Sequence, residues 1–374
     1  MKVLTVFGTR PEAIKMCPVI LELQKHPEIN SITCLTGQHR EMLQQVLDVF
    51  AINAEYNLDI MQIDQNLFSI TTNVLNGLKQ ILEKENPDII LVHGDTATSF
   101  AAGLAGYYMQ IPVGHIEAGL RTYNKYSPFP EEFNRQAIDI FASFYFAPTE
   151  AAKGNLLKEG KQCDSIYVTG NTVIDAMKNT LSTEYVDENL SWSSNGRMIL
   201  LTMHRRENLG KPMRQVFRAC CQIINKYSDV KIIYPIHSNP QIRKIAKEEL
   251  IGCDRIRLIE PLDVVAFHNY INRCYFVMTD SGGIQEEAPS LGKPVLVLRD
   301  TTERPEGIAA GTLKLIGTSE ESVFIEAKRL LEDTVEYAHM STASTPYGDG
   351  MASVRIVNIL LEYMNRKNRN PNEK

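Results

Sequence analysis

The stretch YFVMTDSGGIQEE, residues 275–287, indicates the fold of this chain most directly. Its first five residues have the apolar character of a buried strand, the turn DSGG follows, and a helix pattern opens at Ile284. A strand that turns straight into a helix is typical of a parallel sheet flanked by helices. The small glycines and the N–H groups at the helix start favour a phosphate seat, with Glu286 or Glu287 facing a ribose. The alternative is that Ser and Gly only cap the helix.

A charged loop farther along the chain favours ligand binding over simple capping. The apolar run 294–298 predicts the next strand, and the sequence LRDTTERPE, residues 298–306, leaves its end. In doubly wound sheets the ligand-binding loops leave the carboxyl ends of the strands. The two loops together therefore predict a nucleotide-binding domain.

Strand and helix patterns alternate along the whole chain, and its 374 residues exceed what one hydrophobic core usually supports. Strands are predicted near residues 2–7, 31–36, 88–92, 112–116, 165–169, 198–202, 230–234, 257–259, 275–279 and 294–298. The pattern predicts an α/β protein with two Rossmann-like, doubly wound domains. We place them at residues 1–181 and 198–352, joined by a polar linker at 182–197, and expect a C-terminal helix at 353–366 to pack back on the first domain.

Composition narrows the class of protein. The formal net charge of -6 argues against a nucleic-acid surface. The seven cysteines are odd in number and never form a C-x-x-C pair, which predicts reduced thiols and no zinc site. Neither a signal-peptide core nor a run of eighteen apolar residues occurs. We therefore expect a soluble cytoplasmic protein with neither a nucleic acid nor a membrane as partner.

Two basic turns follow the first predicted strand of each half, as GTRPE at 8–12 and MHRREN at 203–208. In the first, Arg10 and Lys15 could bind one anion together, because Lys15 lies near the opening turn of the helix. The alternative for Lys15 is a solvated helix lysine. In the second, His204 lies between the strand and two arginines, which favours a role in the site. For His93, His115 and His237 a structural role is favoured over a catalytic one.

Three carboxylates follow predicted strands or start a helix, where this topology places chemistry. They are Asp95, Glu117 and Glu131. Asp95 could also be a helix N-cap and Glu131 could complement a helix dipole, but Glu117 is not a turn former. Carboxylates of raised pKa are the usual proton-transfer groups. Asp95, Glu117 and His115 could instead hold a hard cation, but no ligand spacing supports this, so we predict no metal.

These motifs, taken in order, resemble one family. The blocks are Gly8-Thr9-Arg10-Pro11-Glu12, His93-Gly94-Asp95, His115-Ile116-Glu117-Ala118-Gly119-Leu120-Arg121-Thr122, Thr169-Gly170-Asn171-Thr172, His204-Arg205-Arg206-Glu207-Asn208 and Asp280-Ser281-Gly282-Gly283-Ile284-Gln285-Glu286-Glu287. From Met1 to about Gly350 the chain is similar to the bacterial non-hydrolysing UDP-N-acetylglucosamine 2-epimerases. The resemblance implies the GT-B type of two-domain fold with UDP-sugar in the interdomain cleft, no cofactor, and a homodimer.

The resemblance also implies roles for individual residues. It implies catalytic roles for Asp95, Glu117, Glu131 and His204. It implies substrate binding by Arg10, Leu262, Phe267, Ser281, Gly282, Gly283, Glu287 and Arg304. The two basic turns add Lys15 and Arg205 to this set. Without the resemblance, Phe267 reads as a core residue of an amphipathic helix. Some members bind a second substrate molecule, which here implies an allosteric pocket with Gln38, Arg205 and His237, although Glu41 and Asp64 depart from that pattern.

The reaction implied is reversible conversion of UDP-N-acetylglucosamine to UDP-N-acetylmannosamine for cell-surface polysaccharide synthesis. UDP leaves C1 as C2 loses its proton, 2-acetamidoglucal forms, and UDP returns after protonation from the other face. Three alternatives stay open: a hydrolysing epimerase that releases N-acetylmannosamine and UDP, a GT-B glycosyltransferase, and a non-catalytic nucleotide-sugar sensor.

Overall fold

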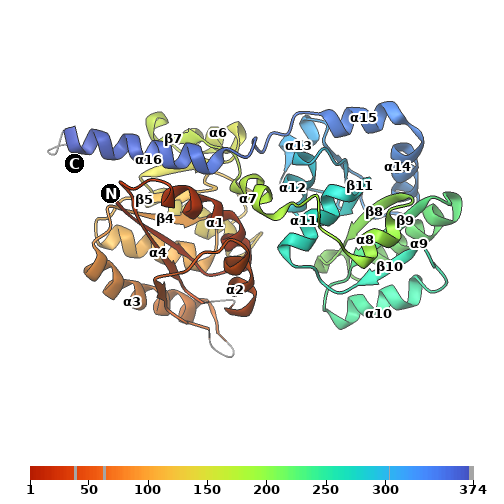
Figure 1. Ribbon diagram of the computed structural model, residues 1–374, viewed down its shortest axis with the longest axis horizontal. Helices are drawn as coiled ribbons and strands as arrows, with labels where there is room; N and C mark the ends of the chain where they lie inside the picture. The colour runs from red at the N-terminus through yellow and green to blue at the C-terminus, as the bar shows by residue number, and fades with distance from the viewer. Residues whose placement is uncertain (38–39, 62–64, 303, 370–374) are drawn as a thin grey trace. The chain divides into compact units, whose positions relative to one another are not determined.

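The computed structural model describes residues 1–37, 40–61, 65–302 and 304–369, and these form two compact units (Figure 1). Unit 1 contains residues 1–179 and 347–374, and unit 2 contains residues 180–346. The described part of each unit contains one parallel sheet flanked by helices. The chain thus has the α/β class and the doubly wound organisation that the strand and helix patterns predict.

The sheet of unit 1 has the strand order β3-β2-β1-β4-β5-β6-β7 over the described residues. Its strands are β1 (Lys2–Phe7), β2 (Asn30–Leu35), β3 (Tyr56–Asn57), β4 (Ile89–His93), β5 (Val113–Ile116), β6 (Phe144–Ala147) and β7 (Ile166–Val168). The central strands are apolar on both faces, as in β4, where every residue is buried. Helices on both faces of a parallel sheet require this pattern.

The helices of unit 1 alternate with these strands. They are α1 (Arg10–Gln24), α2 (Arg40–Val49), α3 (Leu67–Glu85), α4 (Ala97–Tyr108), α5 (Glu131–Phe141), α6 (Glu150–Lys158), α7 (Thr172–Thr180) and α16 (Ala352–Arg369), with a 3₁₀ turn at Cys163–Ser165. α3, α4 and α5 pack in that order beside one another. α16 returns to unit 1 and packs on α1 (Figure 1).

Unit 2 repeats the design with the strand order β10-β9-β8-β11-β12-β13. Its strands are β8 (Arg197–Thr202), β9 (Val230–Pro235), β10 (Ile256–Ile259), β11 (Phe276–Thr279), β12 (Val295–Val297) and β13 (Leu313–Leu315). Its helices are α8 (Glu188–Ser193), α9 (Lys211–Lys226), α10 (Pro240–Glu249), α11 (Val264–Arg273), α12 (Ile284–Ser290), α13 (Pro305–Ala309), α14 (Glu320–Glu332) and α15 (Thr334–Thr342), with a 3₁₀ turn at Arg206–Asn208.

The order of strands reverses direction once in each sheet, between β1 and β4 in unit 1 and between β8 and β11 in unit 2. Loops that leave such a switch point diverge to opposite faces and open a crevice at the carboxyl ends of the strands. The loops concerned are Gly8–Thr9 and Gly94–Thr96 in unit 1, and Met203–Arg205 and Asp280–Gly283 in unit 2. These loops contain most of the residues that the motifs single out.

The segment 182–197 is not a free linker, in contrast to the prediction from its polar composition. It contains α8, whose Leu190 is buried in a core cluster of unit 2, and Trp192 packs against the same cluster. Tyr270 donates a hydrogen bond to the Asp187 carboxylate at the start of α8. A few apolar anchors among many polar residues therefore bind this segment to unit 2. The strands β3, β6 and β13 also lie outside the predicted set.

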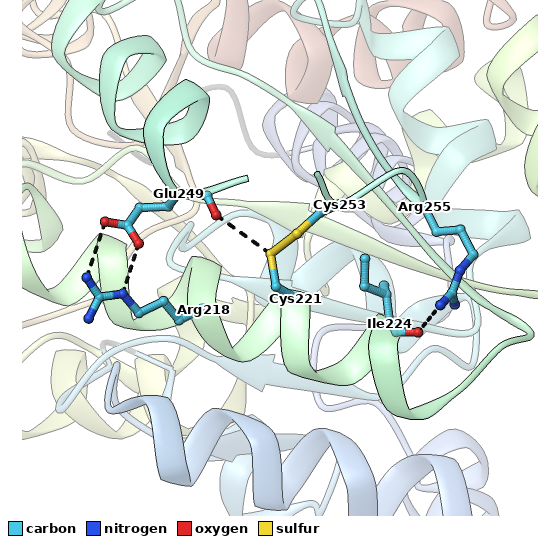
Figure 2. The surroundings of a disulfide bond; sticks show 6 residues. All are labelled: Arg218, Cys221, Ile224, Glu249, Cys253 and Arg255. Carbon is cyan, nitrogen blue, oxygen red and sulfur yellow. Dashed lines mark hydrogen bonds and ion pairs between the residues drawn. A yellow bond between two sulfur atoms is a disulfide. The ribbon is translucent and has the colours of Figure 1, made fainter. Parts of the chain in front are cut away.

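Two of the seven cysteines differ from the prediction of reduced thiols. Cys221 of α9 forms a disulfide with Cys253, in the turn after α10, with the two Cα atoms 6.0 Å apart (Figure 2). The two cysteines are 32 residues apart in sequence, so no local sequence motif predicts this disulfide. Disulfides are rare in cytosolic proteins, so a cytoplasmic location stays a prediction. Within the described residues, no helix has the length and apolar character needed to span a bilayer.

Candidate active site

A buried glutamate fixes the two switch-point loops of unit 1. Glu12, in the first turn of α1, accepts hydrogen bonds from the backbone N–H groups of Gly8 and Thr9 at 3.0 and 2.8 Å. Its other oxygen accepts from the hydroxyls of Thr96 and Ser99 at 2.6 and 2.8 Å. Thr9 caps α1 in return, which completes a capping box. Glu12 thus links the loop after β1 to the start of α4 and sets the position of Arg10, the first residue of α1.

Glu117 occupies a strained and buried position directly after β5. Its φ angle is 66°, in the left-handed region, and its side chain is 8% exposed. Such a conformation costs about 1–3 kcal/mol for a residue with a side chain and persists only where the surroundings enforce it. Here the Glu117 N–H donates to the Phe146 carbonyl at 3.0 Å, and Arg135 donates to the Glu117 carbonyl.

Lys15 lies beside Glu117 rather than in solvent. Its Nζ is 2.7 Å from Glu117 Oε1, and His93 Nε2 is 3.4 Å from Glu117 Oε2. Burial alone raises the pKa of Glu117, but the Lys15 ammonium, His93 and Arg135 outweigh it and hold this pKa below its ordinary value. Burial lowers the pKa of His93 to about 3. Glu117 is therefore an ionised carboxylate next to a neutral imidazole, not the raised-pKa acid that the sequence predicts.

Helix α5 connects Asp95 to Glu117. Arg135 forms an ion pair with the Asp95 carboxylate, and Asn134 Nδ2 donates to the Asp95 carbonyl at 2.9 Å. Glu131, the first residue of α5, precedes Asn134 and Arg135 by three and four positions and so shares their helix face. One oxygen of Glu131 is buried without a hydrogen-bond partner. The structure thus brings the three predicted carboxylates to one region of unit 1. The sequence gives no signal for Arg135 or Asn134. Their partners, the Glu117 and Asp95 carbonyls, lie 18 and 39 positions earlier in the chain, on loops that approach α5 only in the folded structure.

In unit 2, the buried carboxylate of Asp280 organises the basic turn after β8. It accepts the backbone N–H groups of His204 and Arg205 at 3.0 and 2.9 Å, and the Asn208 amide at 3.0 Å. The Arg205 Nε–H donates to the Asp280 carbonyl at 2.9 Å. These contacts join the loop after β8 to the loop after β11, so the two basic side chains stand beside the SGG turn. The sequence motifs predict no individual role for Asp280 or Asn208.

The SGG turn leaves space in front of α12. Neither glycine has a positive φ angle, so backbone strain does not require them. A Cβ on Gly282 would meet only the end of the Arg205 side chain at 3.7 Å, and one on Gly283 only the end of Glu287 at 3.5 Å. The backbone of Ser281 is held by its N–H bond to Thr279 Oγ1 at 2.9 Å. Absent side chains, rather than unusual dihedrals, keep this turn open.

The two glutamates of α12 have different environments. Glu286 is buried and pairs with Arg304. Glu287 is 15% exposed and its Oε2 lies 3.7 Å from the ring of His268. Glu287 is therefore more accessible to a ligand than Glu286, and its implied role at a ribose stays a prediction. Arg304, implied as an anion ligand, is held in place by Glu286.

The remaining residues implied for binding lie on unit 2. Leu262 and Phe267 are half-buried against the core cluster that includes Tyr270 and Ile271, so the Phe267 side chain is in part a packing residue. The His237 ring stacks on the His204 ring, with centroids 5.9 Å apart. Burial lowers the pKa of His204, the nearby His237 and Arg205 lower it further, and Asp280 opposes them. Gln38 lies outside the described residues, so the allosteric role of Gln38, Arg205 and His237 stays a prediction.

Comparison with known proteins gives the family. A family model described as UDP-N-acetylglucosamine 2-epimerase matches residues 21–361. A UDP-N-acetylglucosamine 2-epimerase of Bacillus subtilis is 57% identical over 371 residues, covering 99% of this chain and 98% of the relative. This chain belongs to the UDP-N-acetylglucosamine 2-epimerase family.

Solved structures of epimerases extend the likeness to the fold. A putative UDP-N-acetylglucosamine 2-epimerase from Listeria monocytogenes matches with a TM-score of 0.93 and 52% identity, covering 98% of this chain and 97% of that one. The Neisseria meningitidis enzyme bound to UDP-GlcNAc matches with a TM-score of 0.88 and 50% identity, covering 97% of this chain and all of that one (100%). The two parallel sheets of this epimerase-family member are GT-B-like. The roles implied for its individual side chains stay predictions.

Proposed function

We propose that this protein interconverts UDP-N-acetylglucosamine and UDP-N-acetylmannosamine by epimerisation at C2, without net hydrolysis. The observation that carries the proposal is the group of carboxylates at the strand ends of unit 1, where Glu117 is ionised and buried. Arg135 of α5, the helix that begins at Glu131, contacts both the Asp95 carboxylate and the Glu117 carbonyl. Family membership supplies the substrate, since the Neisseria meningitidis relative is described as bound to UDP-GlcNAc. The product would feed cell-surface polysaccharide synthesis.

The C2 proton is weakly acidic, so its removal needs a base that is already ionised and a bond that breaks with it. A carboxylate of unit 1 takes the C2 proton while the C1–O bond to UDP breaks. The products of this step are 2-acetamidoglucal and UDP. A protonated carboxylate then delivers a proton to the opposite face of C2, and UDP adds back to C1. Each positioned acid or base contributes about 10²- to 10⁴-fold to such a step.

Lys15 keeps Glu117 ionised, but by lowering the pKa of Glu117 it also makes this carboxylate a weaker base. The ammonium at 2.7 Å stabilises the carboxylate, so Glu117 is charged before substrate binds. If Lys15 turns toward an anionic group of the substrate, as its place near the opening turn of α1 favours, Glu117 loses that partner in its buried position. Its proton affinity then rises, because burial disfavours the charged form. We propose this exchange of partners as the step that prepares the base.

Unit 2 supplies the contacts for UDP in this proposal. The turn Ser281–Gly283 and Arg205 surround the open space in front of α12, and cations near the pyrophosphate would stabilise the charge that develops as UDP leaves. His204 stands on the same loop and assists UDP departure. Glu287 binds the ribose, and the Leu262 backbone and Phe267 bind the uracil.

Proton NMR of the protein with UDP-N-acetylglucosamine alone tests the proposal. We expect an equilibrium mixture of the two UDP-sugars. Accumulation of N-acetylmannosamine and UDP would instead indicate the hydrolysing reaction, and an unchanged substrate would leave a transferase or a sensor. Glu117→Gln should lower the rate about 10²-fold or more. Glu22→Gln is a matched control, because Glu22 also pairs with a lysine at 2.7 Å but outside the site.

We further propose that the protein acts as a homodimer in the cytoplasm. The homodimer follows from the family and the location from the composition of the chain. Sedimentation analysis of the purified chain tests the oligomeric state. A monomer at all concentrations up to the micromolar range would contradict it.

A further inference from the structure

A fully buried ion pair lies behind the loops that hold Asp95 and Glu117. His115 is in the middle of β5, and Asp139 is on α5; the side chains of both have no exposed surface. His115 Nδ1 is 2.6 Å from Asp139 Oδ1, and His115 Nε2 is 2.7 Å from the Gly94 carbonyl oxygen. No motif assigns a function to this pair.

The two contacts of the His115 ring fix its protonation. The Gly94 carbonyl can only accept, so Nε2 must donate to it. Asp139 Oδ2 forms an ion pair with Arg121 at 2.6 Å and accepts the Gly119 N–H at 3.3 Å. Asp139 is therefore a carboxylate, which also only accepts. Both ring nitrogens therefore face acceptors, an arrangement that a ring with hydrogen on both nitrogens satisfies.

The same pair touches both catalytic loops. Gly94, whose carbonyl accepts from His115, directly precedes Asp95. Asp139 Oδ2 accepts the Gly119 N–H at 3.3 Å, two residues after Glu117. The His115 ring and the Asp139 carboxylate thus connect the loop after β4 to the loop after β5. Each side chain contributes two polar atoms to this connection.

We propose that His115, as an imidazolium paired with Asp139, is a positioning residue that fixes the Asp95 loop against the Glu117 loop. Its consequence for catalysis rests on the proposed epimerase function, whereas its charge state does not. A buried ion pair is weak as a source of stability, since well-packed apolar residues often replace such a pair without loss. Positioning of the two loops gives the pair a role that apolar side chains could not fill.

The surroundings are consistent with a cationic ring. Arg121 donates to Asp139 Oδ2 at 2.6 Å and to Glu159 at 2.7 Å, so the two carboxylates balance the two cations. The Tyr145 hydroxyl donates to the Asp139 carbonyl at 3.0 Å. On the neighbouring strand, burial lowers the pKa of His93 to about 3. The His93 ring therefore stays neutral beside the His115 cation.

The charge state is tested by ¹⁵N NMR of the histidine rings in the full-length protein at neutral pH. His115→Gln identifies the His115 signals by their loss. We expect both nitrogens of His115 to be protonated in the unmodified protein. In Asp139→Asn the amide can donate to Nδ1, so we expect a neutral ring with hydrogen on Nε2 only. Asp175→Asn is a matched control. Asp175 is on α7 of unit 1, and its buried carboxylate also accepts backbone N–H groups, those of Ala352 and Ser353 at the start of α16. A neutral His115 ring in the unmodified protein would overturn the proposal.

The positioning role is tested by steady-state kinetics of the same variants. His115→Gln should lower kcat about 10²-fold, the effect of a misplacement of about 1 Å, and leave KM within about threefold. Asp175→Asn should change neither constant. An unchanged kcat in His115→Gln, or an equal loss in Asp175→Asn, would refute positioning. If the unmodified protein has no epimerase activity, the proposed function fails, and the NMR result still decides the charge state.

Discussion

Replacement of Lys15 by methionine tests the ion pair at the centre of the site. Lys15 Nζ and Glu117 Oε1 are 2.7 Å apart, and the side chains are 14% and 8% exposed. At an effective dielectric constant of about 20, two unit charges at this distance attract each other by about 6 kcal/mol. Part of that attraction offsets the desolvation of both groups. Removing one partner leaves the other charge buried and unpaired, so we expect a loss of about 3–5 kcal/mol in unfolding free energy at pH 7.

The sign of the pH dependence follows from the lowered pKa of Glu117. A carboxylate whose pKa is lower in the folded state stabilises the fold above its unfolded pKa, and loses that contribution as the pH falls through its folded pKa. In Lys15→Met the folded pKa of Glu117 rises, because the effect of burial is then offset only by the remaining neighbours His93 and Arg135. The difference between variant and parent should therefore be largest at pH 7 and shrink as the pH falls below about 4.5.

Urea unfolding with hydrogen exchange on unit 1 measures this effect without relying on catalysis. Lys25→Met is the matched control, since Lys25 pairs with Glu22 at the same 2.7 Å but has a 66% exposed side chain. Exposed pairs contribute about 0–1 kcal/mol. A loss below about 1 kcal/mol in Lys15→Met, or a loss that grows on acidification, would refute the pairing as described.

Two further variants test unit 2. Cys253→Ser should lower the unfolding free energy by about 3–4 kcal/mol under non-reducing conditions, because the disulfide closes a loop between cysteines 32 residues apart; the exposed thiol in Cys163→Ser is the control, and equal stability of both variants would contradict the link. Asp280→Ala leaves the buried N–H donors around it unpaired, at about 1–3 kcal/mol each, and should weaken UDP binding in calorimetry. Asp263→Ala removes only the N-cap of α11, so it should cost about 1 kcal/mol, and a similar loss in both would argue against the anchoring role.

The fold could be predicted because its signals are local. Apolar runs mark β1, β4, β8 and β11, and the motifs follow those strands at the switch points. β3 has only two residues, which is too few to carry a recognisable pattern. The polar segment 182–197 was harder to place, because one buried leucine and the half-buried Trp192 are enough to hold it on unit 2.

The candidate site could be predicted only in part, because its key contacts are not local. Lys15 and Glu117 are 102 positions apart, and nothing in either sequence context indicates that they meet. Arg135 appears in the sequence as an ordinary residue of an amphipathic helix, yet it contacts both Asp95 and the Glu117 backbone. The charge of a carboxylate also depends on such partners, so the lowered pKa of Glu117 could not be inferred from the motif around it.

Incorporation of deuterium at C2 tests the central claim most directly. The protein is incubated with UDP-N-acetylglucosamine in D₂O, and the position of deuterium in recovered UDP-sugars is read by NMR. We predict that UDP-N-acetylmannosamine carries deuterium at C2, and that Glu117→Gln slows the exchange and the epimerisation together. Epimerised product that retains only protium at C2 would contradict proton transfer by the unit 1 carboxylates.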